Sequence, residues 1–524
     1  MLSYKVDRNM FRFIVRQMAL VGIVLFVTAC STLQKNPEKV VSYSCSPAKE
    51  GTLVESSEAV LSKAEEGQSA FMLIQKNSDA LNWRLALIDH AQKSIDLQVY
   101  IWSDDISGRL ILDRLIIASK RGVKIRLLVD DLPKGGTDEV IALIDRMPNI
   151  QLRRFNPGLI RDGIVRRTFE MSTQFRQLNR RMHNKQLIVD GTWGLIGGRN
   201  LGNPYFGLSS KYNNSDLDLL ITGALISDLT VDFDEYWNAD AAYPGNAMAG
   251  EFSDKKIEKL LKEHDNNVAE DRLLLEQTTI SVFPCDWSQQ FATLKKKMVI
   301  GVGRSLKDSP EVKGDRGIRL VEQMSMENFN VEHMTGIVTP YMIPSKKLLA
   351  DMKRVIEEGQ RIRLLVPSME SINHTMVHSH YKKYRKKLLN AGVELYEFRG
   401  WPSEDFRALC DTPPIKSKFI SLHTKGFVLD ERWVLLGSLN IDPRSININT
   451  EHMVIIDCPA LAKELLNNFD IMIAPSNSYA VTLNDKNDLR WNSDDKEFRI
   501  QPARGFVQRV KDFFWRWIPL ENQL

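Results

Sequence analysis

Two short segments of the chain match each other position for position, and this repetition constrains the fold more than any other feature. They begin at His183 and His423 and are therefore 240 residues apart (423 minus 183). Each has a histidine, a lysine, an aspartate, a glycine and an asparagine at the same spacing: His183, Lys185, Asp190, Gly197 and Asn200 in the first, and His423, Lys425, Asp430, Gly437 and Asn440 in the second. Two half-sites of the same composition indicate one active site assembled from two parts of the chain.

Two further pairs of segments repeat at nearly the same offset. Residues 122–129 are similar to 359–366, and residues 150–155 to 393–398, which gives offsets of 237 and 243 residues (359 minus 122 and 393 minus 150). Because a repeat of this length exceeds the units of solenoid proteins, it indicates duplication of a whole domain. Helix-like and strand-like stretches alternate within the first copy, and this alternation predicts an α/β fold of two tandem domains.

The residue types in the repeated segments suit chemistry at a phosphate. Successive side chains of a strand point to opposite faces, so His183 and Lys185 are expected to point the same way, as are His423 and Lys425. Lysine and asparagine donors stabilise charge on phosphoryl oxygens without a metal. A neutral imidazole attacks phosphorus, a protonated one gives the leaving group its proton, and histidine adopts both states near neutral pH. Two half-sites thus supply a nucleophile and an acid, and we expect neither a metal nor a cofactor.

A histidine and a lysine two positions apart on a strand are, on their own, ordinary surface residues. The recurrence of five residues in register with a domain-scale repeat favours catalysis over that interpretation. A duplicated fold without activity is the alternative that stays open.

Both segments resemble the HxKxxxxD and GxN signatures of the phospholipase D superfamily, and the likeness runs from about residue 71 to the C-terminus. Residues 100–110, 178–185 and 442–445 are similar in particular to bacterial C-type cardiolipin synthases. The resemblance implies a bilobal enzyme of two phospholipase D-type α/β domains, related by a pseudo-twofold axis, with the active site at their seam. It also implies that His183 is the nucleophile, which forms a phosphatidyl-histidine, and that His423 is the acid. The near-symmetry of the sequence itself does not order the two histidines.

One position departs from the superfamily pattern. Gly198 stands where the usual residue is serine, and the second copy has Ser438 there. The C-type group resembles this chain in having two glycines at that point, so we do not interpret Gly198 as a sign of inactivation.

The resemblance further implies two acidic residues, one behind each histidine. Glu451 lies 28 residues after His423 (451 minus 423), and Asp216 occupies the corresponding position in the first half. Each is expected to accept a hydrogen bond from an imidazole and so fix its tautomer; the alternative is a solvent-exposed carboxylate at the start of a strand. Asp190 and Asp430 are expected to form turns at strand ends rather than to carry protons.

The first thirty residues have the pattern of a bacterial lipoprotein signal. Basic residues precede an apolar run at 19–29, and Val-Thr-Ala-Cys at 27–30 resembles a lipobox. We expect cleavage before Cys30 and acylation of that residue, which would place the protein on the periplasmic side of a membrane with a lipid anchor. An uncleaved N-terminal anchor is the alternative. The remaining four of the five cysteines form no recognisable disulfide or zinc pattern.

The expected organisation has six parts. They are a lipoprotein-type signal peptide at 1–29, a polar tether at 30–70, a first phospholipase D-like domain at 71–240, a charged helical insertion at 241–330, a second phospholipase D-like domain at 331–475, and a C-terminal tail with an amphipathic helix at 476–524.

Two segments have compositions suited to a lipid surface. Residues 153–185 contain eight arginines and only two acidic residues, which suits anionic headgroups, although an ordinary solvated face is the alternative. In residues 506–518, apolar and aromatic residues recur at helical spacing between basic residues. That pattern is typical of a helix in the bilayer interface, or of a terminal helix that covers the fold.

The expected function is that of a cardiolipin synthase-like phosphatidyltransferase. The resemblance implies phosphatidylglycerol as acceptor and phosphatidylethanolamine or phosphatidylglycerol as donor, at a membrane surface. Hydrolysis by a phospholipase D is the alternative, because it would use the same catalytic residues. A net charge of only +4 gives no support to a nucleic-acid partner, and two intact half-sites disfavour an inactive lipid-binding scaffold. An unidentified protein partner stays open.

Overall fold

The structure is a computed structural model that describes residues 37–131, 138–161, 164–247, 252–314, 316–327, 329–494, 496–518 and 521–523. The expected signal peptide at 1–29 and the expected anchor at Cys30 lie outside these residues. Within the described ranges, no helix is both long and apolar enough to cross a membrane.

The first half of the chain forms a mixed sheet in which three neighbouring strands, β2, β3 and β4, run parallel. In order across the sheet the strands are β9 (Ala242–Pro244), β4 (Ile150–Phe155), β3 (Lys124–Asp130), β2 (Ser94–Val99), β5 (Gln186–Val189), β6 (Trp193–Gly197), β8 (Asp218–Gly223) and β1 (Ser69–Ile74). The helices of this half are α2 (Thr52–Leu61), α3 (Asn77–His90), α4 (Ile106–Lys120), α5 (Asp138–Asp145), α6 (Ile164–Thr173), α7 (Phe175–Leu178), the short η1 (Asn203–Tyr205) and α8 (Leu225–Asn238).

Helices cover both faces of this sheet, which explains why its strands are apolar runs rather than alternating patterns. Leu85 of α3 and Leu115 of α4 share a core cluster with Leu97 of β2. Phe233 of α8 belongs to a second cluster with Ile188 of β5. The two clusters therefore lie on opposite faces of the sheet.

The second half repeats this arrangement. Its strands, in order, are β18 (Ser478–Leu483), β13 (Glu394–Phe398), β12 (Arg361–Pro367), β11 (Met334–Val338), β15 (Gly426–Leu429), β16 (Trp433–Gly437), β17 (His452–Asp457) and β10 (Val299–Lys307), and β19 (Leu489–Asn492) and β20 (Glu497–Phe498) extend the outer edge. The remaining helices are α9 (Asp254–Leu275), α10 (Ser288–Lys297), α11 (Leu320–Met326), α12 (Lys346–Glu357), α13 (Thr375–Tyr381), α14 (Arg385–Asn390), α15 (Glu404–Cys410), α16 (Pro443–Asn447), α17 (Pro459–Ile473), α18 (Phe506–Trp515) and η2 (Glu521–Gln523).

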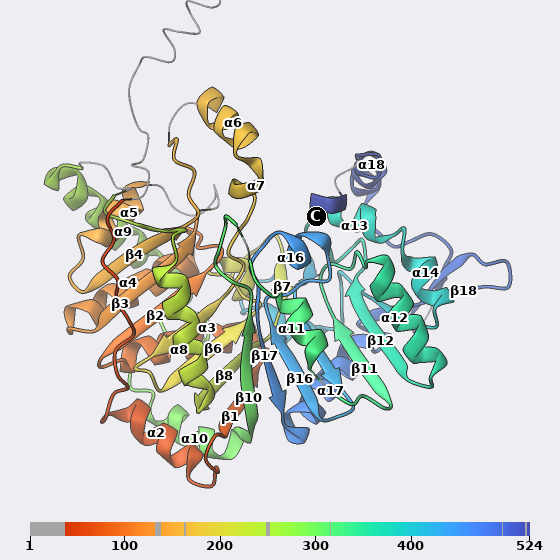
Figure 1. Ribbon diagram of the computed structural model, residues 1–524, viewed down its shortest axis with the longest axis horizontal. Helices are drawn as coiled ribbons and strands as arrows, with labels where there is room; N and C mark the ends of the chain where they lie inside the picture. Colours follow the sequence, from red (N-terminus) through yellow and green to blue (C-terminus); the bar gives the residue numbers. More distant parts are fainter. Residues whose placement is uncertain are drawn as a thin grey trace, which may run out of the picture.

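The two halves meet at the pair β1 and β10, which lie side by side in the middle of the molecule (Figure 1). They are antiparallel, with Ser69 opposite Gly301 and Phe71 opposite Val299. Since β1 also pairs with β8, and β10 with β17, one 18-stranded sheet runs through both halves. A pseudo-twofold axis passes between β1 and β10, and the expectation of two tandem α/β domains in a bilobal enzyme is confirmed.

The position of β10 corrects the expectation for residues 241–330. That segment does contain helices α9, α10 and α11, but it also contains β10, the counterpart of β1 in the second repeat. The sequence conceals this strand because its burial is irregular and most of its residues are only partly buried, with Val302 and Arg304 exposed. The second repeat therefore begins before residue 331.

The expected tether is also corrected, because the structure describes ordered contacts from residue 37 onward. Ser44 donates to Asp96 at 3.0 Å and accepts from Arg126 at 2.5 Å. Leu53 of α2 is buried, and its carbonyl accepts a hydrogen bond from the Trp193 indole at 2.8 Å. Ser42 and Ser44 of this segment make part-buried hydrogen bonds to the first half of the protein, so the segment from residue 37 onward is not a free linker.

Candidate active site

The histidine and lysine of each half lie just before the strands β5 and β15. Their side chains point the same way, as strand alternation predicts: the Lys185 ammonium donates to the His183 carbonyl at 2.5 Å, and Lys425 donates to the His423 carbonyl at 2.6 Å. All four side chains are buried. Each half thus presents one imidazole and one ammonium together.

Asp190 and Asp430 end the two strands in the left-handed region, with φ of 54° and 48°. The Asp190 carboxylate accepts backbone N–H groups from residues 92–94, at the start of β2. Asp430 does the same with residues 332–334, at the start of β11. Both aspartates therefore form turns and position a neighbouring strand, as expected from the sequence.

Each imidazole is held by a carboxylate from the opposite half. His183 Nδ1 lies 2.8 Å from Glu451 Oε2, and His423 Nδ1 lies 2.6 Å from Asp216 Oδ2. Both carboxylates are fully buried, which rules out the alternative of solvent-exposed groups. With Nδ1 donating to a carboxylate, Nε2 of each ring is left as the reactive nitrogen.

Backbone bridges between the halves bring these crossed pairs together. The His183 N–H donates to the Thr450 carbonyl at 2.9 Å, next to Glu451. The His423 N–H donates to the Ser215 carbonyl at 2.9 Å, next to Asp216, where β7 (Asn213–Ser215) and β14 (Ile420–Leu422) pair in parallel. The site is therefore a product of the seam, and neither half holds a complete histidine–carboxylate pair.

The two asparagines differ in their contacts. Asn200 Oδ1 accepts from the Ile101 N–H at 3.1 Å, and its amide donates to the Tyr205 hydroxyl at 2.9 Å. Asn440 is buried, and its Oδ1 makes no hydrogen bond within the described part of the chain. Asn200 shapes the loop after β2, whereas Asn440 keeps hydrogen-bonding capacity for a ligand.

The carboxylate of Asp216 explains why position 198 is a glycine. A Cβ at this position would lie 2.3 Å from Asp216 Oδ1. In the other half Ser438 fills the equivalent place, and its hydroxyl donates to Glu451 Oε2. The shorter aspartate takes the space that a serine side chain would need.

Two tyrosines and one arginine lie at the site and were not predicted as functional residues. The Tyr100 ring packs edge-on against His183 with centroids 4.9 Å apart, and the Tyr205 ring packs in the same way against His423 at 5.2 Å. Arg444, which is near enough to His183 to lower the pKa of that imidazole, stands at the position equivalent to Tyr205. Aligning the repeats beyond their asparagines pairs Asn203-Pro204-Tyr205 with Asp442-Pro443-Arg444, and that pairing was the available signal.

Burial controls the protonation of the site. It lowers the pKa of His183 well below its usual value and that of His423 to about 3, so both imidazoles are neutral at rest. Burial also lowers the pKa of Lys185 to about 7 and that of Lys425 to about 8. For Glu451 burial has the opposite effect and raises the pKa to about 7.

Asp216 differs from Glu451 in this respect. Burial alone would raise its pKa, but His423 and Lys425 outweigh that effect and bring the pKa below its usual value. The two carboxylates therefore ionise in different pH ranges. Among the described residues no three His, Cys, Asp or Glu side chains cluster as a metal-binding group.

The basic segment 153–185 is solvated only in part: Arg167 and Arg176 are exposed, whereas other arginines of the segment are buried. Arg153 is buried and lies 4.1 Å from the Trp237 ring. Arg154 pairs with Asp131 at 2.7 Å, and Arg181 pairs with Asp130 at 3.2 Å. These arginines make internal contacts. The segment that carries them runs from β4 to the seam between the two halves, where His183 lies.

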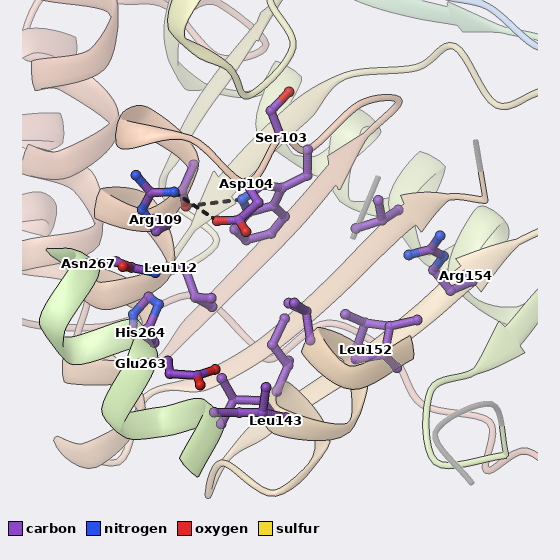
Figure 2. Close-up of a pocket in the computed structure, with 17 residues that line it drawn as sticks. Ser103, Asp104, Arg109, Leu112, Leu143, Leu152, Arg154, Glu263, His264 and Asn267 are labelled. Atoms are coloured by element: carbon purple, nitrogen blue, oxygen red, sulfur yellow. Dashed lines mark hydrogen bonds and ion pairs between the residues drawn. The ribbon is translucent and has the colours of Figure 1, made fainter. Parts of the chain in front are cut away.

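A cavity of about 150 Å³ lies apart from the histidines, between α4, α5 and α9 (Figure 2). Its wall is apolar, and its polar residues are Ser103, Asp104, Arg109, Arg154, Glu263, His264 and Asn267. None of the eight expected site residues lines it. The loop after β2 connects the cavity with the active site, because its Tyr100 packs against His183 and its Trp102 lines the cavity.

Comparison with known proteins identifies the family of the chain. The family model described as "Cardiolipin synthase, PLD-like domain" matches residues 85–237 and 331–473. The chain belongs to this family. It is 31% identical over 474 residues to cardiolipin synthase C of Escherichia coli (strain K12), which covers 87% of this chain and 96% of that relative. The major cardiolipin synthase ClsA of Bacillus subtilis (strain 168) is 25% identical over 411 residues, which covers 78% of this chain and 70% of that relative.

A solved structure supports the same fold. The phosphatidylserine synthase of Haemophilus influenzae Rd KW20 superposes with a TM-score of 0.53 at 17% identity, over 77% of this chain and 86% of that one. Together with the family match, this confirms the resemblance to the phospholipase D superfamily and makes the protein an enzyme of that superfamily.

Proposed function

We propose that the protein is a phosphatidyltransferase that makes cardiolipin from two phospholipids. The observation that carries the proposal is the pair of crossed contacts, His183 with Glu451 and His423 with Asp216, which supply two oriented imidazoles at one seam. Membership of the cardiolipin synthase family supports phospholipids as the substrate class.

The first step breaks the donor lipid. His183 Nε2 attacks phosphorus and forms a P–N bond, while the P–O bond to the headgroup breaks and the headgroup oxygen takes a proton from His423. With phosphatidylethanolamine as donor, ethanolamine leaves. The Lys185 and Lys425 ammonium groups and the Asn440 amide stabilise the charge on the phosphoryl oxygens.

The second step transfers the phosphatidyl group. A hydroxyl of phosphatidylglycerol attacks phosphorus, His423 takes its proton, and the P–N bond breaks to regenerate His183. His423 must be protonated for the first step, although burial keeps it neutral at rest. An anionic phosphodiester beside the ring raises the pKa of the imidazole and so supplies the required state.

The decisive experiment is an assay of lipid products. Purified protein with labelled phosphatidylglycerol and phosphatidylethanolamine should yield labelled cardiolipin and release ethanolamine. The second candidate, hydrolysis, is favoured by the same crossed pairs because water can replace the acceptor. Phosphatidic acid as the sole product would establish hydrolysis and reject transfer.

The assignment of His183 as nucleophile rests on the family resemblance, and trapping tests it. In His423→Ala, a donor lipid whose leaving group needs no proton, such as a p-nitrophenyl ester, should let a phosphatidyl group accumulate on His183, because the onward transfer still needs a base. Label recovered on His423 in His183→Ala would reverse the order.

For location, we propose attachment to the periplasmic side of a membrane through acylated Cys30. Palmitate should label the wild-type chain and not Cys30→Ser. Equal labelling of both chains would reject the anchor.

A further inference from the structure

The C-terminal helix α18 attaches to the second half through polar residues and turns its apolar residues outward. Gln508 is 8% exposed and donates to the Met369 carbonyl at 2.5 Å, and Asp512 is 4% exposed and accepts from Lys382. The outward residues are large and apolar: Phe506 is 79% exposed, Phe513 56%, Phe514 64% and Trp517 71%. A terminal helix that covered the core would show the reverse pattern.

The helix α6 shows a similar reversal in the first half, and α7 after it adds one exposed aromatic side chain. Glu170 of α6 is buried and accepts the backbone N–H groups of Leu159 at 2.8 Å and Ile160 at 3.0 Å. Met171 of α6 and Phe175 of α7 are 44% and 42% exposed. Two unrelated segments thus attach to the fold through buried polar side chains and leave apolar side chains exposed to solvent.

A chain of hydrogen bonds next to the active site links the segment after α7 to the segment after α18. The helix α7 ends five residues before His183 (183 minus 178). Asn179 directly after it accepts from Arg444 at 2.8 Å and donates to Gln523 of η2, which follows α18, at 2.7 Å. In Figure 1, α6, α7 and α18 project from one side of the molecule, at the top of the view.

The exposed charges of α6, α7, α18 and the residue that follows α18 are all positive. Arg167, Arg176, Lys511 and Arg516 are exposed. The acidic residues of the same three helices, Glu170 and Asp512, are both buried. Apolar side chains between exposed basic ones suit the interface of an anionic bilayer better than a protein surface of mixed charge.

The course of the N-terminal segment leads to the same side. The Ala48 N–H donates to the Asp190 carbonyl, at the end of the strand β5 and near the start of β2. Farther toward the N-terminus, the Val40 carbonyl accepts from Arg153, near the end of β4 from which the chain passes toward α6. Only six residues lie between Cys30 and Pro37, where the described chain begins, and the seven steps between these two residues span at most about 25 Å.

We propose that the exposed apolar residues of α6, α7 and α18 form a docking surface that inserts into an anionic phospholipid bilayer and holds the seam against it. This deepens the proposed phosphatidyl transfer and rests on it for the identity of the lipid. The surface draws on both halves of the protein, so it fixes the orientation of the active site as well as its distance from the membrane.

Vesicle binding tests the docking surface without an acyl anchor. The chain from residue 31 onward, which retains every described residue, is mixed with vesicles of phosphatidylglycerol and sedimented. A variant carries serine at four positions of the surface: Met171, Phe175, Phe513 and Phe514. A matched control carries serine at four exposed apolar positions elsewhere: Val231, Leu273, Leu274 and Ile471. Thermal unfolding establishes that both variants fold.

We expect the surface variant to bind at least tenfold more weakly than wild type, and the control to stay within twofold. Wild type should bind phosphatidylcholine vesicles more weakly and lose affinity as salt is added. Unchanged binding by the surface variant overturns the proposal. So does a wild-type dimer in analytical ultracentrifugation that the surface substitutions dissociate without affecting vesicle binding, because the surface is then an interface between copies.

A short-chain phosphatidylglycerol below its critical micelle concentration separates docking from catalysis. The surface variant should turn over this monomeric substrate as wild type does, while losing turnover on vesicles. If wild type makes no cardiolipin from either form yet still binds vesicles through this surface, the proposed transfer fails and the docking surface stands.

Discussion

Replacing Glu451 by Gln tests the crossed pairing most directly, because the change keeps the shape of the side chain and reverses its hydrogen bonding. In wild type the carboxylate accepts the Nδ1 proton of His183 at 2.8 Å. A hydrogen bond to a charged group contributes about 1.5–3 kcal/mol, which corresponds to a factor of about 10–150 in rate. A glutamine amide can also donate to Nδ1, and the proton then resides on Nε2, where the attack must occur. The equivalent Asp→Asn change in a serine protease lowers kcat about 10⁴-fold through this tautomer.

We therefore expect Glu451→Gln to lower kcat by about 10²–10⁴ with little change in KM, measured as cardiolipin formed per enzyme. A single-turnover assay should show slower formation of the phosphatidyl-enzyme. Asp216→Asn should also slow the second step, because its partner His423 acts as the acid in the first step and as the base in the second. The control is thermal unfolding, which shows whether both variants fold. A loss in kcat below tenfold for Glu451→Gln would refute the role assigned to this contact.

Three further results are expected. Activity should be highest close to pH 7, because Glu451 ionises at about 7 whereas Lys185 and Lys425 lose their protons at about 7 and about 8; the lower limb should be absent from the pH profile of Glu451→Gln. Gly198→Ser should cost about 1–3 kcal/mol in urea unfolding and displace Asp216, whereas a smaller cost than that of Ser438→Gly would contradict the clash at 2.3 Å. Removing residues 31–50 should lower the free energy of unfolding by about 3 kcal/mol, because Arg126 and Asp96 lose the Ser44 hydroxyl; an unchanged midpoint would mean a free tether.

The duplicated architecture could be predicted from the sequence because catalytic residues and whole strands recur at one offset. The positions of His183 and His423 and the turn roles of Asp190 and Asp430 followed from strand alternation and turn chemistry. The sequence does not show which half of the protein supplies the carboxylate that holds each histidine. Spacing places Glu451 near His423 along the chain, yet the seam delivers it to His183.

Predictions of solvent exposure from composition were wrong where polar residues have partners inside the fold. Residues 37–50 and the arginines at 153, 154 and 181 read as solvent-facing, but each of these arginines pairs with a group of another segment. In β10 the signal was too weak, since a strand whose residues are mostly only partly buried has no clear period. Such pairings are tertiary, so a local pattern does not reveal them.

The antiparallel pair of β1 and β10 has a mechanical consequence. Opening the two halves like a hinge would break backbone hydrogen bonds at the centre of an unbroken sheet, between residues such as Ala70 and Ile300. The backbone pairing therefore resists widening of the spacing between the two histidines. In the proposed transfer, each substrate brings its phosphate to a seam of nearly constant width and keeps its acyl chains outside it.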